Sequence, residues 1–229
     1  MKRDQRQKYF PVLINMREFP CLVIGGGKVA LRKVSDLLRY QAKITIVSPQ
    51  LSRQLLKIAA RNKITVIKKI YSSKYLKNYK MVFCTTNNPE TNKLVQMDCR
   101  RKGILLNTAD QPSMCDFILP ANLIRGDLII STSSQGKAPF YSKYVRDKLK
   151  TFVPPYTKQI IELAADFRKQ LLANSHSIST SVRKKAYREF LSTNWEDLLA
   201  TRGKRATYEH MRGILKKLEK NKMARSYEQ

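Results

Sequence analysis

Three consecutive glycines lie where a short apolar segment gives way to a helical pattern. Gly25, Gly26 and Gly27 follow residues 21–24, which favour a strand, and precede residues 29–40, whose apolar spacing predicts a helix. Glycine at such a turn lets the backbone approach a pyrophosphate closely, and the helix N-terminus stabilises its negative charge. The turn therefore predicts a dinucleotide site.

Further residues at this turn extend the pattern. Gly25, Gly27 and Ala30 satisfy G-x-G-x-x-[G/A], with Lys28 and Val29 at the opening of the helix. The alternative interpretation is a glycine-rich turn that serves only close packing of the helix on the strand. The motif is specific only because it directly follows a strand and opens a helix.

The ribose-binding position does not have the usual acidic residue. NAD sites commonly place Asp or Glu at the end of the second strand, whereas this chain has Ser48 and Pro49 there. Ser48 could hydrogen-bond a ribose hydroxyl, and Arg32 or Arg53 could meet a 2′-phosphate. Residue chemistry alone therefore leaves NAD and NADP both open.

Polar residues follow two later strands at the same predicted edge of the sheet. Thr85 and Thr86 follow residues 81–84, and we expect them to contact the cofactor, although a polar turn capping the next helix fits equally. Asp110 follows residues 104–107 and could accept a proton from a substrate while hydride leaves to the cofactor. A lone Asp before Gln111 and Pro112 is also typical of a turn.

The remaining elements must position these residues. Residues 43–47, 65–68 and 128–132 also favour strands, and residues 10–15 a short strand before the glycine motif; helical spacing covers 52–61, 91–102 and 141–151. Strands that alternate with helices predict an α/β fold of the Rossmann type, with a doubly wound parallel sheet that the strand at 128–132 completes.

The C-terminal part reads as a small helical domain. Three helices are expected at 156–173, 182–199 and 207–220, with polar breaks at 174–181 and 202–204, after Pro154 and Pro155 end the preceding helix. These segments lack the tight turn of a DNA-reading helix-turn-helix, so no nucleic-acid partner is expected. The predicted division is 1–113, 114–153 and 154–229.

Composition narrows the class of protein further. The 229 residues include 45 Lys and Arg against 17 Asp and Glu, a formal charge of +28, which attracts anions such as a polycarboxylate but is also typical of a merely solvated basic surface. No metal site is expected, because only His176 and His210 are present and no CxxC pair occurs. No signal peptide or membrane span is expected either, which favours the cytoplasm.

Several motifs together resemble the precorrin-2 dehydrogenase and sirohydrochlorin ferrochelatase family, which includes the N-terminal module of siroheme synthase. The similarity covers residues 9–149 in the family's order and spacing. The motifs that carry it are Tyr9-Phe10-Pro11, Gly25 to Ala30 with Arg32-Lys33, Thr45 to Pro49, Thr85-Thr86-Asn87-Asn88, Asn107-Thr108-Ala109-Asp110, Cys115 to Ala121, Ser131 to Pro139 and Tyr144 to Leu149.

The resemblance implies an NAD-binding Rossmann domain followed by a dimerisation and active-site segment and a helical part. It implies a homodimer that oxidises precorrin-2 to sirohydrochlorin, with Asp110 as the essential aspartate and Val29 and Pro49 at the cofactor. The implied substrate-binding residues are Asn107, Ser134, Gly136 and Lys137. The loop departs from the family at Gln135, where a second glycine is common.

The high positive charge of the protein would attract the carboxylate-rich substrate of this family. Insertion of ferrous iron, which some members also perform, is left open. Three alternatives remain: another Rossmann enzyme or NADP-dependent reductase, a tetrapyrrole-binding carrier without turnover, and a redox-sensing or nucleic-acid-binding protein that uses the basic C-terminal helices.

Overall fold

The computed structural model describes residues 8–173 and 179–226, with the side chains of the last helix described to residue 217. These residues pack into two compact units. The first contains the described residues up to 119 together with 135–137, and the second contains 120–134 and the described residues from 138 onward. The division into 1–113, 114–153 and 154–229 remains a prediction.

A five-stranded parallel sheet forms the centre of the first unit. Its strand order is β3-β2-β1-β4-β5, so the chain winds outward from β1 in one direction and then crosses to β4 on the other side. The strands are β1 (Cys21–Ile24), β2 (Ile44–Val47), β3 (Thr65–Ile67), β4 (Met81–Cys84) and β5 (Leu105–Thr108). The crevice between β1 and β4 is the place where such sheets bind ligands.

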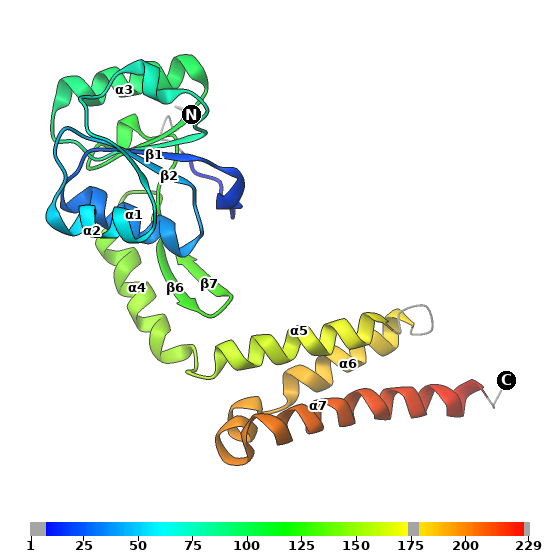
Figure 1. The fold of residues 1–229 in the computed structure, drawn as a ribbon. Helices are drawn as coiled ribbons and strands as arrows, with labels where there is room; N and C mark the ends of the chain where they lie inside the picture. Colours follow the sequence, from blue (N-terminus) through cyan, green and yellow to red (C-terminus); the bar gives the residue numbers. More distant parts are fainter. Residues whose placement is uncertain (1–7, 174–178, 227–229) are drawn as a thin grey trace. The chain divides into compact units, whose positions relative to one another are not determined.

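Helices cover both faces of this sheet (Figure 1). Alternate residues of β1 point to opposite faces: Cys21 and Val23 pack with α1 and α2, while Leu22 and Ile24 pack with residues of α3. Burial on both faces explains why β1 and β4 consist of four buried residues each. The helices are α1 (Lys28–Arg39), α2 (Arg53–Arg61) and α3 (Pro89–Lys102), and the short 3-10 turns are η1 (Met16–Glu18), η2 (Ser73–Leu76) and η3 (Pro112–Met114). The predicted Rossmann-type α/β fold is confirmed.

The strand predicted at residues 10–15 is wrong. This segment is irregular and leads into η1, where the Asn15 side chain accepts a hydrogen bond from the Arg17 amide. Pro11 has no amide to donate to a neighbouring strand, and the side chains of Phe10 and Leu13 are exposed rather than buried. Apolar composition alone therefore misled the prediction.

The strand predicted at 128–132 exists, but it does not belong to the parallel sheet. As β7 (Leu128–Thr132) it pairs antiparallel with β6 (Ala121–Arg125), a strand that the sequence analysis missed. Only Gly126 and Asp127 separate the two strands, and Gly126 has a φ of +60° that suits a tight hairpin turn. A two-residue connection cannot make the crossover that parallel pairing requires.

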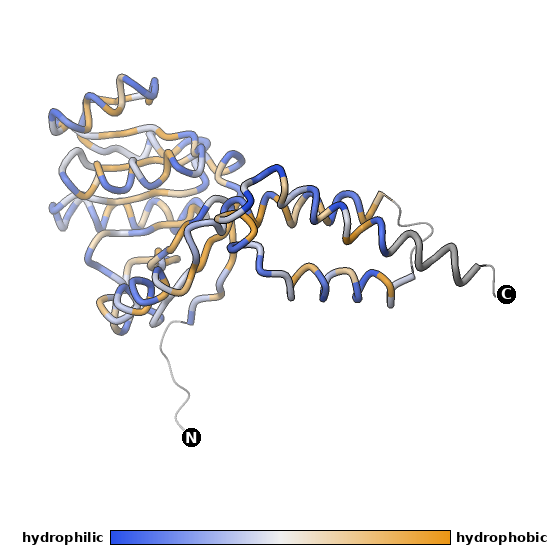
Figure 2. The backbone as a smooth tube through the Cα atoms, turned by 90° about the horizontal axis from the view of Figure 1, so that it is seen from below, coloured by the Kyte–Doolittle hydropathy of each residue, from blue (hydrophilic) through white to orange (hydrophobic). Residues whose placement is uncertain are grey.

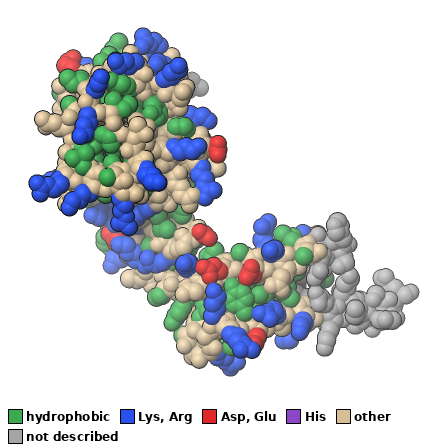
Figure 3. Space-filling view, in the orientation of Figure 1, with side chains coloured by type: hydrophobic (Ala, Val, Ile, Leu, Met, Phe, Trp, Pro, Cys, Tyr) green, Lys and Arg blue, Asp and Glu red, His purple; other side chains and the backbone are tan. Residues whose placement is uncertain are grey.

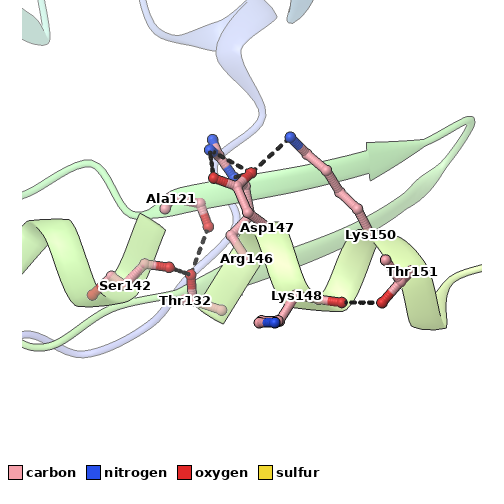
Figure 4. Close-up of polar contacts among 8 residues, drawn as sticks. All are labelled: Ala121, Thr132, Ser142, Arg146, Asp147, Lys148, Lys150 and Thr151. Carbon is pink, nitrogen blue, oxygen red and sulfur yellow. Dashed lines mark hydrogen bonds and ion pairs between the residues drawn. The ribbon is translucent and has the colours of Figure 1, made fainter. Parts of the chain in front are cut away.

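Helix α4 (Pro139–Phe152) packs on this hairpin. The Thr132 hydroxyl lies 2.8 Å from the Ser142 carbonyl oxygen on α4 and 3.1 Å from the Ala121 carbonyl oxygen on β6, as Figure 4 shows. On the same helix, hydrogen bonds from Arg146 and Lys150 lower the pKa of Asp147 to about 2. Polar contacts thus join the three elements.

Three C-terminal helices pack around a separate core, and their coloured parts carry both apolar and polar residues (Figure 2). They are α5 (Thr157–Ala173), α6 (Thr180–Ser192) and α7 (Trp195–Ser226). The helix predicted at 182–199 is divided between α6 and the start of α7, because Asn194 interrupts it and caps α7 by accepting a hydrogen bond from the Asp197 amide at 3.2 Å. The predicted break at 202–204 is a kink at Gly203, and the predicted break at 174–181 falls largely outside the described residues.

Candidate active site

The glycine turn lies at the carboxyl edge of the sheet and depends on glycine at two of its three positions. Gly25 has a φ of +117°, and a β-carbon there would lie 2.6 Å from the Thr85 hydroxyl oxygen. A β-carbon on Gly26 would lie only 1.9 Å from the Gln50 carbonyl oxygen. Neither position can accept a side chain without displacing the loops after β2 or β4.

Gly27 differs from the other two glycines. A β-carbon built on it meets no protein atom within 4 Å, and it is the N-cap of α1 without any side-chain hydrogen bond. The first-turn amides of α1, beginning at Lys28 and Val29, therefore have no side-chain cap, while buried Ala30 lets the helix approach the sheet. An open helix N-terminus of this kind fits the pyrophosphate of a dinucleotide.

The side chain of Ser48 makes its hydrogen bond within its own turn. Ser48 is buried, and its hydroxyl donates to the Gln50 carbonyl oxygen at 2.6 Å, the same oxygen that approaches Gly26. Pro49 is exposed beside it. The residue thus supports the glycine turn, and a ribose contact of its hydroxyl stays a proposal.

Thr85 and Thr86 also make local contacts. The Thr85 amide and hydroxyl both donate to the Ile24 carbonyl oxygen at 2.8 Å, which joins the ends of β1 and β4. The Thr86 hydroxyl oxygen accepts from the Asn88 amide, and Asn88 caps α3. The capping turn weighed in the sequence analysis is therefore present, and cofactor contact by either threonine stays a proposal.

Asp110 lies at the same edge of the sheet as the glycine turn. Ile24, Cys84 and Thr108 are in register at the ends of β1, β4 and β5, so the residues that follow them come out side by side. The carboxylate is exposed, and its backbone adopts a left-handed φ of 57° that Asp tolerates better than most residues. Asp110 therefore projects from a tight turn at the edge where the fold binds ligands.

Two buried oxygens flank Asp110 without a hydrogen-bond partner among the described residues. They are the hydroxyl of Thr108 and the side-chain carbonyl of Gln111. Buried polar atoms almost always have partners, so these two are available to a bound molecule or to water.

A lysine that the sequence analysis did not place in the site faces this turn. Lys33 on α1 is half-buried, with its Nζ 5.8 Å from the centre of the Phe83 ring. Burial and the charge of Arg32 lower the pKa of Lys33, whereas Asp36, Cys115 and Asp110 act in the opposite direction. The ammonium group is therefore within electrostatic reach of Asp110, and its position after the glycine motif was the signal that could have found it.

Asn107 holds the segment after η3 against β5. Its side-chain amide donates to the Phe117 carbonyl oxygen at 3.0 Å, and the Asp116 carboxylate accepts from the Leu106 amide at 2.9 Å. Cys115 adds a third link, because its sulfur lies 3.2 Å from the Thr108 amide. These contacts fix the turn that carries Asp110, and substrate binding by Asn107 stays a proposal.

The loop residues predicted to bind substrate belong to different units. Gly136 and Lys137 are exposed and pack with the first unit, where Asp110 lies. Ser134 belongs to the second unit, and its hydroxyl accepts from the Ala138 amide at 2.9 Å, just before α4.

The visible face of the first unit carries many Lys and Arg side chains and few carboxylates (Figure 3). Within the described part of the chain, no group of three His, Cys, Asp or Glu side chains could hold a metal ion; His176 lies outside it. The helices of the described residues include none long and apolar enough to cross a membrane.

Comparison with known proteins places this site in a class. Residues 12–121 match the family NAD_binding_7, which is described as "Putative NAD(P)-binding". The first unit is thus a dinucleotide-binding domain, in agreement with the predicted NAD cofactor and with the open N-terminus of α1.

Curated relatives indicate which dinucleotide-binding proteins this chain resembles. The siroheme synthase of Pseudoalteromonas translucida is 35% identical over 164 residues, 72% of this chain and 35% of that protein. The siroheme synthase of Methylobacillus flagellatus is 31% identical over 188 residues, 82% of this chain and 38% of that protein. These comparisons confirm the resemblance that the sequence motifs indicate, and the chain spans about a third of the length of these curated relatives.

A solved structure supports the fold. The structure titled "SirC, precorrin-2 dehydrogenase" is similar with a TM-score of 0.72 and 24% identity, covering 93% of this chain and all of that one. At this level of identity the likeness establishes the architecture, including the helical C-terminal part.

Proposed function

We propose that this protein is an NAD-dependent precorrin-2 dehydrogenase, which oxidises precorrin-2 to sirohydrochlorin in siroheme biosynthesis. The observation that carries the proposal is the common position of the glycine turn and Asp110. Both lie at the carboxyl edge of one sheet, on strands whose ends are in register. Similarity to the siroheme synthases supports the choice of substrate.

The cofactor would lie across the ends of β1 and β4. The amides of Gly26, Gly27, Lys28 and Val29 would hold its pyrophosphate, because the N-terminus of α1 is open there. Ser48, Pro49, Thr85 and Thr86 would line the nucleoside ends. When bound, NAD supplies the acceptor for a hydride from the substrate.

Asp110 would act as the base that takes the proton lost on oxidation, or would stabilise the positive charge that develops on the macrocycle. The Lys33 ammonium lies within electrostatic reach of this carboxylate. Asn107, Ser134, Gly136 and Lys137 would bind the substrate, and the exposed Lys137 suits its carboxylates.

The proposal extends to the state of the protein in the cell. We infer a cytoplasmic homodimer, and a reducing compartment is supported by the four free, buried cysteines. Insertion of ferrous iron into sirohydrochlorin is a second activity to be tested separately. Iron is a substrate in that reaction.

The test is anaerobic turnover of enzymatically generated precorrin-2, followed by absorbance, with NAD and NADP in parallel. The decisive variant is Asp110→Asn, because Asn tolerates the left-handed backbone of this turn while the charge is lost. Asp127→Asn in the β6–β7 turn is the matched control. We expect NAD-dependent formation of sirohydrochlorin that Asp110→Asn abolishes and Asp127→Asn preserves.

Other outcomes identify the alternatives. Binding of sirohydrochlorin without turnover by a folded protein would refute the dehydrogenase and indicate a carrier. Binding of NADP with no response to tetrapyrroles would indicate a different reductase. Added ferrous iron, monitored as siroheme formation, decides the second activity.

A further inference from the structure

Gln135 occupies a backbone conformation that most residues avoid. Its φ is 55°, in the left-handed region, and Gly136 follows with a φ of 80°. Glycine adopts such angles freely, whereas a residue with a β-carbon does so at a cost in free energy. A glutamine at this position therefore needs a compensating interaction.

The side chain of Gln135 makes that interaction with the backbone of Tyr9. Its Oε1 accepts a hydrogen bond from the Tyr9 amide at 2.7 Å, and its Nε2 donates to the Tyr9 carbonyl oxygen at 3.1 Å. The amide thus satisfies both backbone polar groups of one residue, as a neighbouring strand residue would. The two residues are 126 positions apart in sequence.

Tyr9 in turn lies beside the segment that supports Asp110. Burial and the charges of Cys115 and Asp116 raise the pKa of the Tyr9 phenol, which places the ring near that segment. Cys115 is bonded to the Thr108 amide, two residues before Asp110. Gln135 is therefore bonded to a residue that lies within electrostatic reach of the segment supporting Asp110, and all of these residues belong to the first unit.

We propose that Gln135 is a positioning residue, whose amide fastens residues 135–137 to the N-terminal segment at Tyr9 and so orders Gly136 and Lys137 for substrate. This inference rests on the proposed function, in which that loop binds the carboxylate-rich tetrapyrrole. Gln135 itself takes no part in the chemistry. Its contact with Tyr9 affects the affinity of the loop for substrate.

Two variants and one matched control test the proposal. Gln135→Gly removes the side-chain amide while keeping a backbone suited to the positive φ, so the contact with Tyr9 is lost without backbone strain. Gln135→Glu keeps an acceptor for the Tyr9 amide but turns a carboxylate toward the Tyr9 carbonyl oxygen. Gln41→Gly is the control, because Gln41 is also exposed, has a φ of 56° and accepts a hydrogen bond from Arg17 elsewhere in the N-terminal segment.

The first measurement is hydrogen exchange of the Tyr9 amide, which needs no turnover. We expect exchange to be about five- to tenfold faster in Gln135→Gly, since one net hydrogen bond protects this amide. Gln135→Glu should lie between Gln135→Gly and the wild type, and Gln41→Gly should match the wild type. Unchanged exchange in Gln135→Gly would show that the contact does not exist in solution.

The second measurement is the split between KM and kcat. We expect the KM for precorrin-2 to rise about five- to tenfold in Gln135→Gly, with kcat and the KM for NAD unchanged. Faster exchange with an unchanged KM, or an equal rise in KM for Gln41→Gly, overturns the positioning role. A wild-type protein without turnover refutes the proposed function instead, and the Tyr9 exchange still decides whether the contact exists.

Discussion

A methyl group on Gly26 would overlap backbone atoms of Gln50 and Leu51. In Gly26→Ala the new β-carbon would lie 1.9 Å from the Gln50 carbonyl oxygen and 2.9 Å from the Leu51 Cα, whereas ordinary contacts begin near 3.4 Å. The obstructing atoms are backbone, so the segment before α2 must move by about 1.5 Å. That movement strains the hydrogen bond from the Ser52 amide to the Gly26 carbonyl oxygen.

Overpacking and one weakened hydrogen bond together cost about 2–4 kcal/mol. For a chain of this length, that loss lowers the midpoint of thermal unfolding by roughly 5–10 °C. The assay is thermal denaturation with and without NAD, because a ligand that binds only the folded protein raises the midpoint. We expect Gly26→Ala to lose both stability and most of the NAD-dependent rise.

Gly27→Ala is the matched control, because its β-carbon meets no protein atom within 4 Å. It should unfold within about 4 °C of the wild type, the small loss reflecting a poorer N-cap. Its affinity for NAD should nevertheless fall at least tenfold, since the methyl group enters the space expected for the pyrophosphate. A stable Gly26→Ala would refute the close approach of the two loops, and normal NAD binding by Gly27→Ala would place the cofactor elsewhere.

Three further predictions concern the supporting contacts. Tyr71→Phe removes the hydrogen bond from the Tyr71 hydroxyl to buried Asp98, 3.0 Å long, and should lower the free energy of unfolding by about 1.5–3 kcal/mol in urea denaturation; an unchanged midpoint would contradict this. Asn88→Ala removes the side chain that caps α3 by accepting a hydrogen bond from the Thr91 amide, and it should lower the free energy of unfolding by about 1 kcal/mol in the same assay. An unchanged free energy of unfolding would show that the cap does not stabilise the protein. The pKa of Asp147 is lowered to about 2, so its two basic neighbours on α4 stabilise the fold above the unfolded pKa of about 3.9, and this contribution is lost as the pH falls through 2. NMR titration should find that low pKa, and the stability difference between wild type and Asp147→Asn should vanish on acidification; a pKa of about 3.9 would refute the contacts.

Much of the first unit follows from local pattern. Strands β1 and β4 and the helix after Gly27 were predicted within one or two residues, because a short apolar run bounded by turn residues indicates a buried strand. The segment at 10–15 shows the limit of that approach. Its apolar residues resemble a strand, but no neighbouring strand pairs with them.

Some features of the candidate site were also predicted from the sequence, and others were not. Asp110 and the glycine turn were found because a residue type at the end of a strand indicates its place in a parallel sheet. The partners of Ser48 and Asn107 could not be found, since the Gln50 and Phe117 carbonyl oxygens come into reach only after the loops fold. Lys33 was missed as a site residue because its place after the glycine motif does not show that Asp110, distant along the chain, lies within electrostatic reach.

By itself, the sequence determined the alternation of strands and helices, the glycine turn and the family that the chain resembles, because these depend on residue types at short spacings. Only the tertiary structure decided that residues 121–132 form a separate hairpin and that the Gln135 amide holds Tyr9. The physical reason is that strand pairing and side-chain hydrogen bonds depend on distance in space. Residues 126 positions apart become neighbours only when the whole fold has formed.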